Sequence, residues 1–578
     1  MTRGHEVVDR RWVPRAAGGG AAFIGLIDVL SALSHGLHPR LRRLGHFLPG
    51  TVTNTAAAAT LVIGVLLLLL AHGLYRRKRR AWQAVVILLG VSVISHVVKG
   101  FELAEALVAI ALLAVLISYR DQFYALGDPR TRWRALTTFL TLAVADVVFG
   151  MLLLQVQGRH IRGHPSVRQR LQQVFDGLVG VSGPVQFRGE RISDLVYALL
   201  FALGAVTALT TAYLILRPAE PTPHLRPDDD RRMRALLDRY GELDSLGYFA
   251  LRRDKSVVWS RTGKSCIAYR VVSGVMLASG DPLGDPEAWP GAIEEFLLEA
   301  ARHAWTPAVL GCSERGGQVW IRETGMDALE IGDEAIVETG EFSLEGRAMR
   351  NVRQMVNRVE RLGYACTVRR VHEIPPEERA AVVRAAGAWR SGHTERGFSM
   401  ALGRFGEAAD GNCVLVTAIK DGRIRAFLHF VPWGEDGLSL DLMRRDRAAD
   451  PGLNDLLIVA ALRAAPQLGV RRMSLNFAVF RSALERGEKL GAGPVIRLWR
   501  RLLLFASKWF QIESLYRFNA KFQPTWNPRY VVFRRTGDLP RIAAAGLEAE
   551  AFLVMPKLSR LLGRSHEEPA SAFEQTHA

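Results

Sequence analysis

Residues 218–227, PAEPTPHLRP, separate two halves of the chain that differ in composition. Four prolines in this stretch end any preceding helix and favour an extended linker. The whole chain of 578 residues combines 49% hydrophobic with 23% charged residues, so the two kinds must be segregated along it. This composition excludes a small disulfide scaffold and a disordered protein. We expect a transmembrane region over 1–217, a linker over 218–235 and a soluble part beyond.

Six apolar stretches precede the linker, at roughly 20–36, 55–75, 81–99, 103–119, 135–156 and 194–216. The second and the sixth are long enough to cross about 30 Å of hydrocarbon. We therefore expect an α-helical transmembrane bundle of about six spans. Asp28 and Asp146 fall inside predicted spans. A charge there suggests a functional group by default, and the structural alternative is that each faces another helix.

The positive charge is concentrated in the N-terminal half. The chain carries a formal net charge of +18, and residues 1–217 hold 24 Lys+Arg against 11 Asp+Glu. We expect this positive charge to attract anionic lipid headgroups and to set the membrane topology, and we do not interpret it as a nucleic-acid-binding signature. The run RRKRR at 76–80 predicts a cytoplasmic loop, which puts both termini and the soluble part in the cytoplasm of a multi-pass plasma-membrane protein. Six arginines between 157 and 193 conflict with that orientation.

After the linker the pattern becomes α+β. Helical patterns at 345–362 and 453–467 alternate with short β-rich runs such as CVLVTAI and RMSLNFAVF, which predicts two α/β units over 236–370 and 371–560. A tail over 561–578 is expected to be disordered. The four cysteines show no CxxC spacing, which indicates a reduced compartment and no structural zinc.

Several common catalytic motifs are missing from the sequence, namely GxxxxGK[ST], GxGxxG after a strand, HExxH and GxSxG. ATP chemistry, hydride transfer and zinc hydrolysis therefore lose support, and we expect neither a cofactor nor a metal. Group transfer carried out by carboxylates and cations remains.

Five strings in order resemble the phosphatidylglycerol lysyltransferases, the aminoacyl-phosphatidylglycerol synthases known as multiple peptide resistance factors. They are GYFALRRDKSVVWS from Gly247, ASGDPLGD from Ala278, EFSLEGRAMRNVRQMVNRVERLGY from Glu341, SLDLMRRD from Ser439 and LYRFNAKFQPTWNPRY from Leu515. The string SLNFAVFRSALERGEKLGAGP is most similar to actinobacterial members that carry a fused lysyl-tRNA synthetase, which this sequence does not include.

The resemblance implies tandem GNAT-like acyltransferase domains. It implies an aminoacyltransferase that moves an amino acid from aminoacyl-tRNA to the glycerol hydroxyl of phosphatidylglycerol. Lysine from lysyl-tRNA is the first expectation, with alanine, arginine and ornithine open. Such a product lowers the negative surface charge and gives resistance to cationic antimicrobial peptides. A homo-oligomer is a further possible partner, and the oligomeric state is left open. Two alternatives remain: a membrane-anchored GNAT-type N-acyltransferase that uses acyl-CoA, and a non-enzymatic lipid flippase or transport module.

Two candidate catalytic residues lie in LSLDLMRRD, residues 438–446. By the resemblance, Asp441 and Arg444 match the family's catalytic pair. The reaction needs a base for the lipid hydroxyl and a cation for the lipid phosphate. Strand alternation puts Leu442 on the opposite face from Asp441 and Met443, so Arg444 faces away from Asp441 unless the strand ends or bulges. The Asp-Pro-Gly turn that follows favours an ending, and an ordinary strand-end salt bridge is the alternative.

The other candidates lie in less regular sequence. Lys521, in NAKFQPTWNPRY, matches the family's catalytic lysine and is suited to stabilising a tetrahedral intermediate, while a surface lysine is the alternative. Glu395, in WRSGHTERGFSM, is a weaker candidate, and His393 beside it is an alternative base. The tract GDPLGD at 280–285 is interpreted as scaffold.

Two basic helical faces are candidates for tRNA or lipid binding. One includes Arg347, Arg350 and Arg353, which could hold tRNA phosphates or form a solvated face. The other lies in the amphipathic stretch 495–513, where Arg497, Arg500, Arg501 and Lys508 cluster opposite an apolar side. A core helix is the alternative for that stretch.

Overall fold

A computed structural model describes residues 12–34, 63–71, 73–75, 77–98, 103–123, 129–181, 183–216, 221, 223–390, 397–479 and 512–551. They form two units, a helical unit that ends at Glu220 and an α/β unit that begins at Pro221. This boundary lies inside the proline-rich stretch that separates the two compositions.

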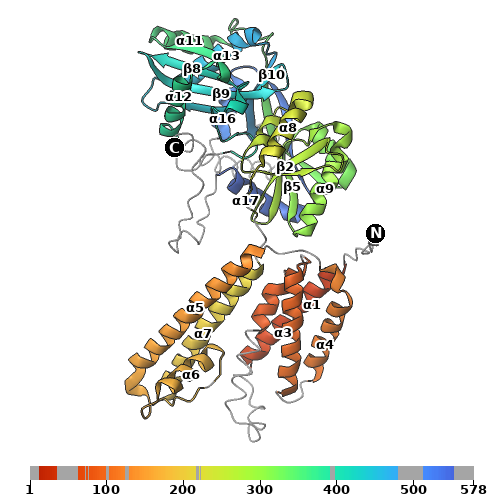
Figure 1. Ribbon diagram of the computed structural model, residues 1–578, viewed down its shortest axis with the longest axis vertical. Helices are drawn as coiled ribbons and strands as arrows, with labels where there is room; N and C mark the ends of the chain where they lie inside the picture. Colours follow the sequence, from red (N-terminus) through yellow and green to blue (C-terminus); the bar gives the residue numbers. More distant parts are fainter. Residues whose placement is uncertain are drawn as a thin grey trace, which may run out of the picture. The chain divides into compact units, whose positions relative to one another are not determined.

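The helical unit contains two groups of helices, each with its own apolar core. The first group comprises α1 (Trp12–Ser34), a helix over Ile63–Tyr75, α3 (Arg79–Val98) and α4 (Leu103–Ser118). The second comprises α5 (Pro129–Val156), α6 (Val167–Leu178) and α7 (Glu190–Leu216), as Figure 1 shows. The Ser166 hydroxyl and the Gln169 side chain form a capping box that begins α6.

Two helical segments in the described part of the chain are long and apolar enough to cross a bilayer. They are Leu136–His160, of 25 residues, and Ile192–Ala212, of 21. The apolar segments Ile63–Tyr75 and Leu107–Ser118 are shorter, and at 1.5 Å per residue a helix of about 12 residues covers only about 18 Å. The expectation of about six spans is therefore wrong for the described residues, which provide two.

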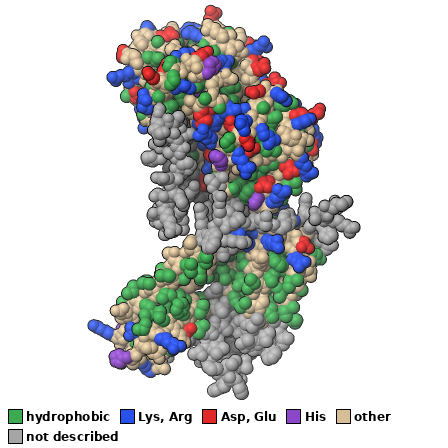
Figure 2. Space-filling model, viewed as in Figure 1, with side chains coloured by type: hydrophobic (Ala, Val, Ile, Leu, Met, Phe, Trp, Pro, Cys, Tyr) green, Lys and Arg blue, Asp and Glu red, His purple; other side chains and the backbone are tan. Residues whose placement is uncertain are grey.

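Exposed apolar side chains cover the second group of helices. Val144, Val148 and Leu152 on α5 and Leu195 and Val206 on α7 are all exposed. Hydrophobic side chains also dominate the helical unit in Figure 2, whereas the α/β unit presents a mixed charged surface. An apolar surface of this kind is expected on helices that face lipid.

Asp146 is buried between α5 and α7, where its carboxylate accepts a hydrogen bond of 2.7 Å from the Thr207 hydroxyl. Asp146 thus has a polar partner on the neighbouring helix, which agrees with the alternative that it faces another helix rather than a functional site. The side chain of Asp28 lies outside the described residues.

The α/β unit alternates helices and strands along the chain. Its helices are α8 (Pro227–Tyr240), α9 (Trp289–Arg302), α10 (Glu314–Thr324), α11 (Arg350–Arg361), α12 (Pro376–Ala388), α13 (Leu453–Ala464), α16 (Ile512–Ala520) and α17 (Leu539–Ala549). Its strands are β1 (Ser256–Trp259), β2 (Ser265–Val272), β3 (Val275–Ser279), β4 (Leu283–Gly284), β5 (Thr306–Cys312), β6 (Asp327–Glu338), β7 (Ala365–Arg370), β8 (Val414–Lys420), β9 (Arg423–Trp433), β10 (Gly437–Arg445), β11 (Arg472–Val479) and β12 (Thr525–Phe533).

The described strands form one continuous sheet in the order β1-β2-β3-β5-β12-β6-β11-β10-β9-β8-β7, with β4 beside β2. One layout occurs twice in it. Three antiparallel strands lead through a helix into a strand parallel to the third, first as β1-β2-β3-α9-β5 and then as β8-β9-β10-α13-β11. The soluble half therefore contains an internal structural repeat.

The two repeats exchange their last strands. β6 follows β5 in the chain but pairs with β11, whereas β12 follows β11 in the chain but pairs with β5. β6 and β12 also pair with each other at the centre of the sheet. The C-terminal α17 packs on β2 and β3. The predicted boundary near residue 370 thus does not separate two sheets. The two repeats share one sheet, in which each repeat pairs with a strand that follows the other repeat in the chain.

Two apolar cores cover opposite faces of the second repeat. One lies under α11 and α13 and includes Val416, Leu428 and Leu440. The other lies under α12 and includes Leu415 and Phe427. Alternate residues of β8 and β9 enter alternate cores, as the two-residue period of a strand requires. The strands of this repeat are therefore sandwiched between helices, which Figure 1 shows.

A buried charge cluster lies where the strands are exchanged. Arg529 on β12 donates hydrogen bonds to Glu334 on β6 at 2.9 and 2.5 Å and to Asp244 at 2.8 Å. All three side chains are at most 5% exposed. Burial disfavours the charge of Arg529, but Glu334, Asp244 and Asp281 more than offset it and hold the pKa of Arg529 above its ordinary value. One cation thus links β12, β6 and the segment before β1.

Replacing Arg529 by Met should destabilise the protein by about 3–5 kcal/mol, because Glu334 and Asp244 would keep buried charges without a cation. Thermal unfolding of the purified full chain in detergent measures this. Arg535→Met, which removes an exposed arginine just after the same strand, serves as the control. Equal melting temperatures for Arg529→Met and the control would contradict the role given to the cluster.

Candidate active site

A β-bulge at Asp441 decides which way the candidate pair faces. On β10, Leu440 pairs with Phe430 of β9 and Leu442 pairs with His429, so Asp441 is the extra residue. The alternation reverses there, since Leu442 packs in the core under α12 and Met443 in the core under α13.

The bulge brings Asp441 and Arg444 to the same face of the sheet. Arg444 donates to the carbonyl oxygen of Ala386 on α12 at 3.2 Å. The expectation that Leu442 lies on the opposite face from Asp441 was wrong. The strand also does not end at Asp441 but continues to Arg445. The bulge, one of the two exceptions considered, is what the structure contains.

The Asp441 carboxylate is buried and has a donor on each oxygen. Oδ1 accepts from the backbone N–H of Leu402 at 2.7 Å, and Oδ2 lies 2.7 Å from Nδ1 of His429. The side chains of Asp441 and His429 are 3% and 1% exposed. A buried carboxylate requires such donors, and its oxygens keep further lone pairs for a ligand.

The segment 397–406, which supplies Leu402, is fixed at several points to other parts of the unit. The Glu550 carboxylate accepts from the N–H groups of Phe398 and Ser399 at 2.7 and 3.0 Å. Arg252 donates to the carbonyl oxygen of Ala401 at 3.0 Å, and Arg404 donates to that of Leu251 at 2.6 Å. The position of Asp441 therefore depends on contacts from both repeats.

Lys255 lies fully buried beneath this segment. Its Nζ donates to the hydroxyl of Ser279 at 2.6 Å and to the carbonyl oxygen of Phe249 at 3.1 Å, and it lies 4.6 Å from the ring centroid of Phe398. Burial, assisted by the nearby positive charge of Arg252, lowers the pKa of Lys255 to about 7.

The two parallel strands of the second repeat separate early. β10 and β11 pair only over Gly437–Ser439 and Arg472–Ser474. Beyond these residues β11 has its own irregularity, where Asn476 adopts a φ of 80° and donates to the carbonyl oxygen of Leu440 at 3.3 Å. The separation begins directly beside the bulge at Asp441.

Lys521 lies on the other face of the sheet from Asp441. Its Nζ is 2.9 Å from Asp455 in the first turn of α13 and 5.0 Å from the Phe518 ring centroid. The lysine side chain is 42% exposed. Within the described residues, no hydrogen bond or ion pair joins Lys521 to Asp441 or Arg444. The structure thus places Asp441 and Arg444 on one face of the sheet and Lys521 beside α13.

The predicted basic helix is α11, which begins at Arg350 and buries Val352, Val356 and Val359. Arg350 is exposed on the opposite side, and Arg347 is exposed in the turn before the helix. Arg353 instead donates to the carbonyl oxygens of Leu344 and Gly346, so it caps the preceding turn.

Several predicted residues lie outside the described part of the chain. They are Glu395 and His393 and the four cations of the stretch 495–513, namely Arg497, Arg500, Arg501 and Lys508.

The GDPLGD tract is attached to the first repeat. Asp281 accepts from the backbone N–H of Ser313 at 2.8 Å and from its hydroxyl at 2.5 Å, where Ser313 caps α10. Burial and the nearby carboxylate of Asp244 raise the pKa of Asp281 to about 7. These contacts fit the interpretation of the tract as scaffold.

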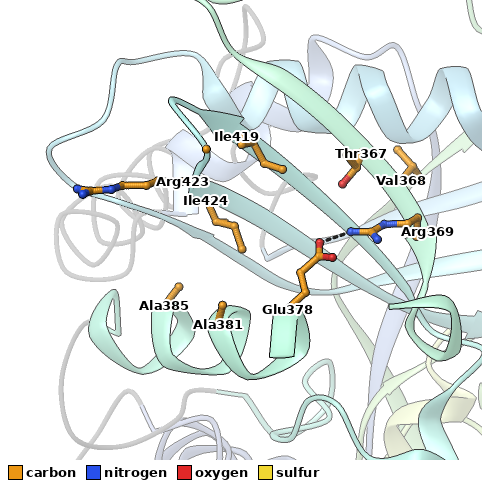
Figure 3. A pocket seen from close by; sticks show the side chains of 10 residues that line it. Thr367, Val368, Arg369, Glu378, Ala381, Ala385, Ile419, Arg423 and Ile424 are labelled. Atoms are coloured by element: carbon orange, nitrogen blue, oxygen red, sulfur yellow. Dashed lines mark hydrogen bonds and ion pairs between the residues drawn. The ribbon is translucent and has the colours of Figure 1, made fainter. Parts of the chain in front are cut away.

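A groove of about 980 Å³ lies between α12 and the strands β7, β8 and β9 (Figure 3). It exists because Ala381 and Ala385 on α12 are too short to fill the space above Ile424. An ion pair between Arg369 and Glu378 crosses one end. Ala385 lines the groove and its neighbour Ala386 accepts from Arg444, so the groove is on the same face as the candidate pair.

Metal ligands are not clustered in the described ranges, where no group of three His, Cys, Asp or Glu side chains could hold an ion.

Sequence reasoning missed His429, Leu402 and Asp455, the partners of the predicted residues. His429 had a detectable signal. The runs RAFLHFVPW and LSLDLM are separated by a short polar turn, and a hairpin register puts His429 opposite the neighbourhood of Asp441.

Replacing Lys255 by Met should change how stability depends on pH. An unfolded lysine has a pKa of about 10.4, so between pH 7 and about 10 the unfolded chain binds more protons and the wild type gains stability as pH rises. The variant should lack this gain. Thermal unfolding of the full chain in detergent at pH 6.5, 8 and 9.5 tests it, with the exposed Lys264→Met as control. If the melting temperatures of wild type and Lys255→Met changed with pH in the same way, Lys255 would not be a neutral lysine in the folded protein.

The sequence matches two protein families. Residues 234–533 match the family described as phosphatidylglycerol lysyltransferase, C-terminal, and residues 9–216 match the transmembrane region of lysyl-tRNA synthetase. Among solved structures, the α/β unit is similar to L-PGS from Bacillus licheniformis, with 23% identity, a TM-score of 0.48, and coverage of 58% of this chain and 98% of that one. A C-terminal domain from Agrobacterium fabrum gives 23% identity, a TM-score of 0.47, and coverage of 56% and 98%.

Curated relatives extend the similarity over almost the whole sequence. The lysylphosphatidylglycerol biosynthesis bifunctional protein LysX of Rhodococcus jostii is 40% identical over 98% of this chain and 51% of its own length. The protein of the same name from Mycobacterium avium is 41% identical over 94% of this chain and 47% of its own. The chain thus spans about half the length of these relatives. The resemblance seen in the sequence strings is confirmed, and this chain belongs to the phosphatidylglycerol lysyltransferase family.

Proposed function

We propose that this chain transfers lysine from lysyl-tRNA to the glycerol hydroxyl of phosphatidylglycerol. The relatives' names refer to lysylphosphatidylglycerol biosynthesis, which supports lysine over alanine, arginine or ornithine. The observation that carries the proposal is the bulge that turns Asp441 and Arg444 to one face of the sheet. A membrane region fits a lipid acceptor. Transfer between two esters needs no ATP, so the catalytic groups can be side chains alone.

In this mechanism, Asp441 accepts the proton of the glycerol hydroxyl as the oxygen attacks the lysyl ester. Arg444, a guanidinium three residues further on the same face, pairs with the lipid phosphate. Lys521 supplies positive charge for the oxyanion of the tetrahedral intermediate. The ester bond to the tRNA ribose then breaks, and the ribose oxygen takes up the proton that Asp441 accepted. Glu395 remains a candidate for a supporting carboxylate.

We assign the two substrates to opposite faces of the sheet. The lipid headgroup approaches from the α12 face, where Asp441, Arg444 and the groove lie. The aminoacyl end approaches from the α13 face, where Lys521 lies. In this proposal the two reacting groups meet where β10 separates from β11.

Asp441→Asn should keep the fold and lower kcat by about 10²-fold or more, because the amide still accepts from Leu402 N–H but cannot take a proton. Formation of lysyl-phosphatidylglycerol from pre-charged lysyl-tRNA and phosphatidylglycerol vesicles measures the effect. Asp436→Asn, which alters the ion pair with Arg472 at the far end of the same hairpin, should be nearly unaffected. Activity of Asp441→Asn within about twofold of wild type would remove Asp441 from the mechanism.

The exposed cations at the start of α11 are proposed to hold tRNA phosphates. Arg347 and Arg350 are exposed and available for this role. Arg353 is assigned to it less strongly, because its guanidinium already caps a turn. The cations at 497, 500, 501 and 508 are proposed to lie on the anionic bilayer surface, as an amphipathic helix would.

Changing Arg347 and Arg350 together to Gln should raise the KM for lysyl-tRNA several-fold at low salt and leave kcat nearly unchanged. Each lost phosphate contact should lower the slope of log K against log salt by about 1. Tests at several KCl concentrations measure both effects, with the exposed Arg384→Gln on α12 as the matched control. An unchanged KM and salt slope would assign these arginines to the solvated surface.

We further propose that the α/β unit lies in the cytoplasm beside a multi-pass region of the plasma membrane. Lysylation converts a headgroup of charge −1 to about +1, which weakens attraction of cationic antimicrobial peptides to the surface. An acyl-CoA-dependent acyltransferase and a non-enzymatic flippase are less well supported by the family and its relatives.

A further inference from the structure

We propose that His429 is a positioning residue that holds the Asp441 carboxylate in its reactive orientation. The inference rests on the proposed function, because it assigns a role to the partner of the proposed base. It rests on the hairpin register of β9 and β10, the hydrogen-bond pattern around Asp441 and the surroundings of the imidazole.

The hairpin register brings these two side chains together. Up to the bulge, Leu440 pairs with Phe430, so the next positions, Asp441 and His429, lie on the same face of the sheet. At the bulge Leu442 takes the place opposite His429, and Asp441 remains beside it with its carboxylate 2.7 Å from Nδ1 of His429.

The imidazole is oriented by its surroundings. The ring packs edge-to-face against Phe405 with centroids 5.0 Å apart. The buried Nε2 has no hydrogen-bond partner among the described residues. An unpaired N–H donor at Nε2 would be costly, so the tautomer with the proton on Nδ1 is favoured, and that proton points at Asp441. His429 is therefore a donor to the carboxylate.

The other donor to Asp441 holds only one of its two oxygens. Leu402 N–H, from a segment without helix or strand, bonds Oδ1, whereas His429, on the interior strand β9 between β8 and β10, contacts Oδ2. A carboxylate rotates freely about its terminal bond unless both oxygens are held. Loss of the His429 donor should leave Asp441 buried but able to turn, which lowers kcat more than it changes substrate binding.

Two variants separate a hydrogen-bonding role from a packing role. His429→Leu keeps an apolar side chain of similar size and removes the donor, and we expect kcat for lysyl transfer to fall at least tenfold with little change in either KM. His429→Asn carries an amide N–H as many bonds from Cα as Nδ1, so it should restore kcat to within about threefold of wild type. His372→Leu, which removes an exposed histidine that contacts Gly411, should behave as wild type.

Combining substitutions tests whether His429 acts through Asp441. The double variant His429→Leu/Asp441→Asn should be no slower than Asp441→Asn alone, because the positioning residue has no function once the base is gone. Losses that multiply, or a His429→Leu enzyme within twofold of wild type, would overturn the inference while leaving the proposed function intact. Failure of His429→Asn to recover activity would assign His429 to packing. Wild-type protein that forms no lysyl-phosphatidylglycerol would overturn the proposed function and this role together.

Discussion

The two hydrogen bonds that Arg529 donates to Oε2 of Glu334 hold together the part of the sheet on which the rest of the α/β unit depends. These residues lie on β12 and β6, the two strands that the repeats exchange. A buried carboxylate is costly without a cation, so the two strands are stabilised as a pair rather than separately. Glu334 also accepts from Ser474 on β11, and Ser439 on β10 donates to the carbonyl oxygen of Ser245. The cluster therefore reaches the last paired residues before β10 and β11 separate.

A single inserted residue then decides the chemistry that the second repeat can support. Without the bulge, Asp441 would still face α12, but Arg444 would face α13 on the opposite side of the sheet. With it, a carboxylate and a guanidinium share a face, on which the carboxylate also contacts a histidine from the neighbouring strand. The same irregularity coincides with the point where β10 separates from β11.

The sequence supports the parts of this structure that follow from local patterns. Proline content predicts the separation near 218–227, and the β-rich runs CVLVTAI and RMSLNFAVF predict β8 and β11. The exchange of β6 and β12 could not be predicted, because both are ordinary strands whose partners are fixed by Arg529 and Glu334 across 195 positions. The candidate site was predicted only in part. Asp441 and Arg444 were proposed by resemblance, and alternation gave no reason to expect the bulge. His429 was missed, although the hairpin register puts it opposite Asp441.

The burial of Asp441 has a consequence for selectivity if it serves as the proposed base. Lysyl-tRNA is an activated ester, and water competes with the glycerol hydroxyl as its acceptor. A base that is 3% exposed has little contact with bulk water, so it activates a hydroxyl only after a ligand has entered its face of the sheet. Phosphatidylglycerol brings its hydroxyl together with a phosphate that Arg444 can pair with, whereas water brings no such anchor. In the proposed mechanism, burial of the base excludes water and the arginine anchors the lipid, so both features would favour transfer over hydrolysis.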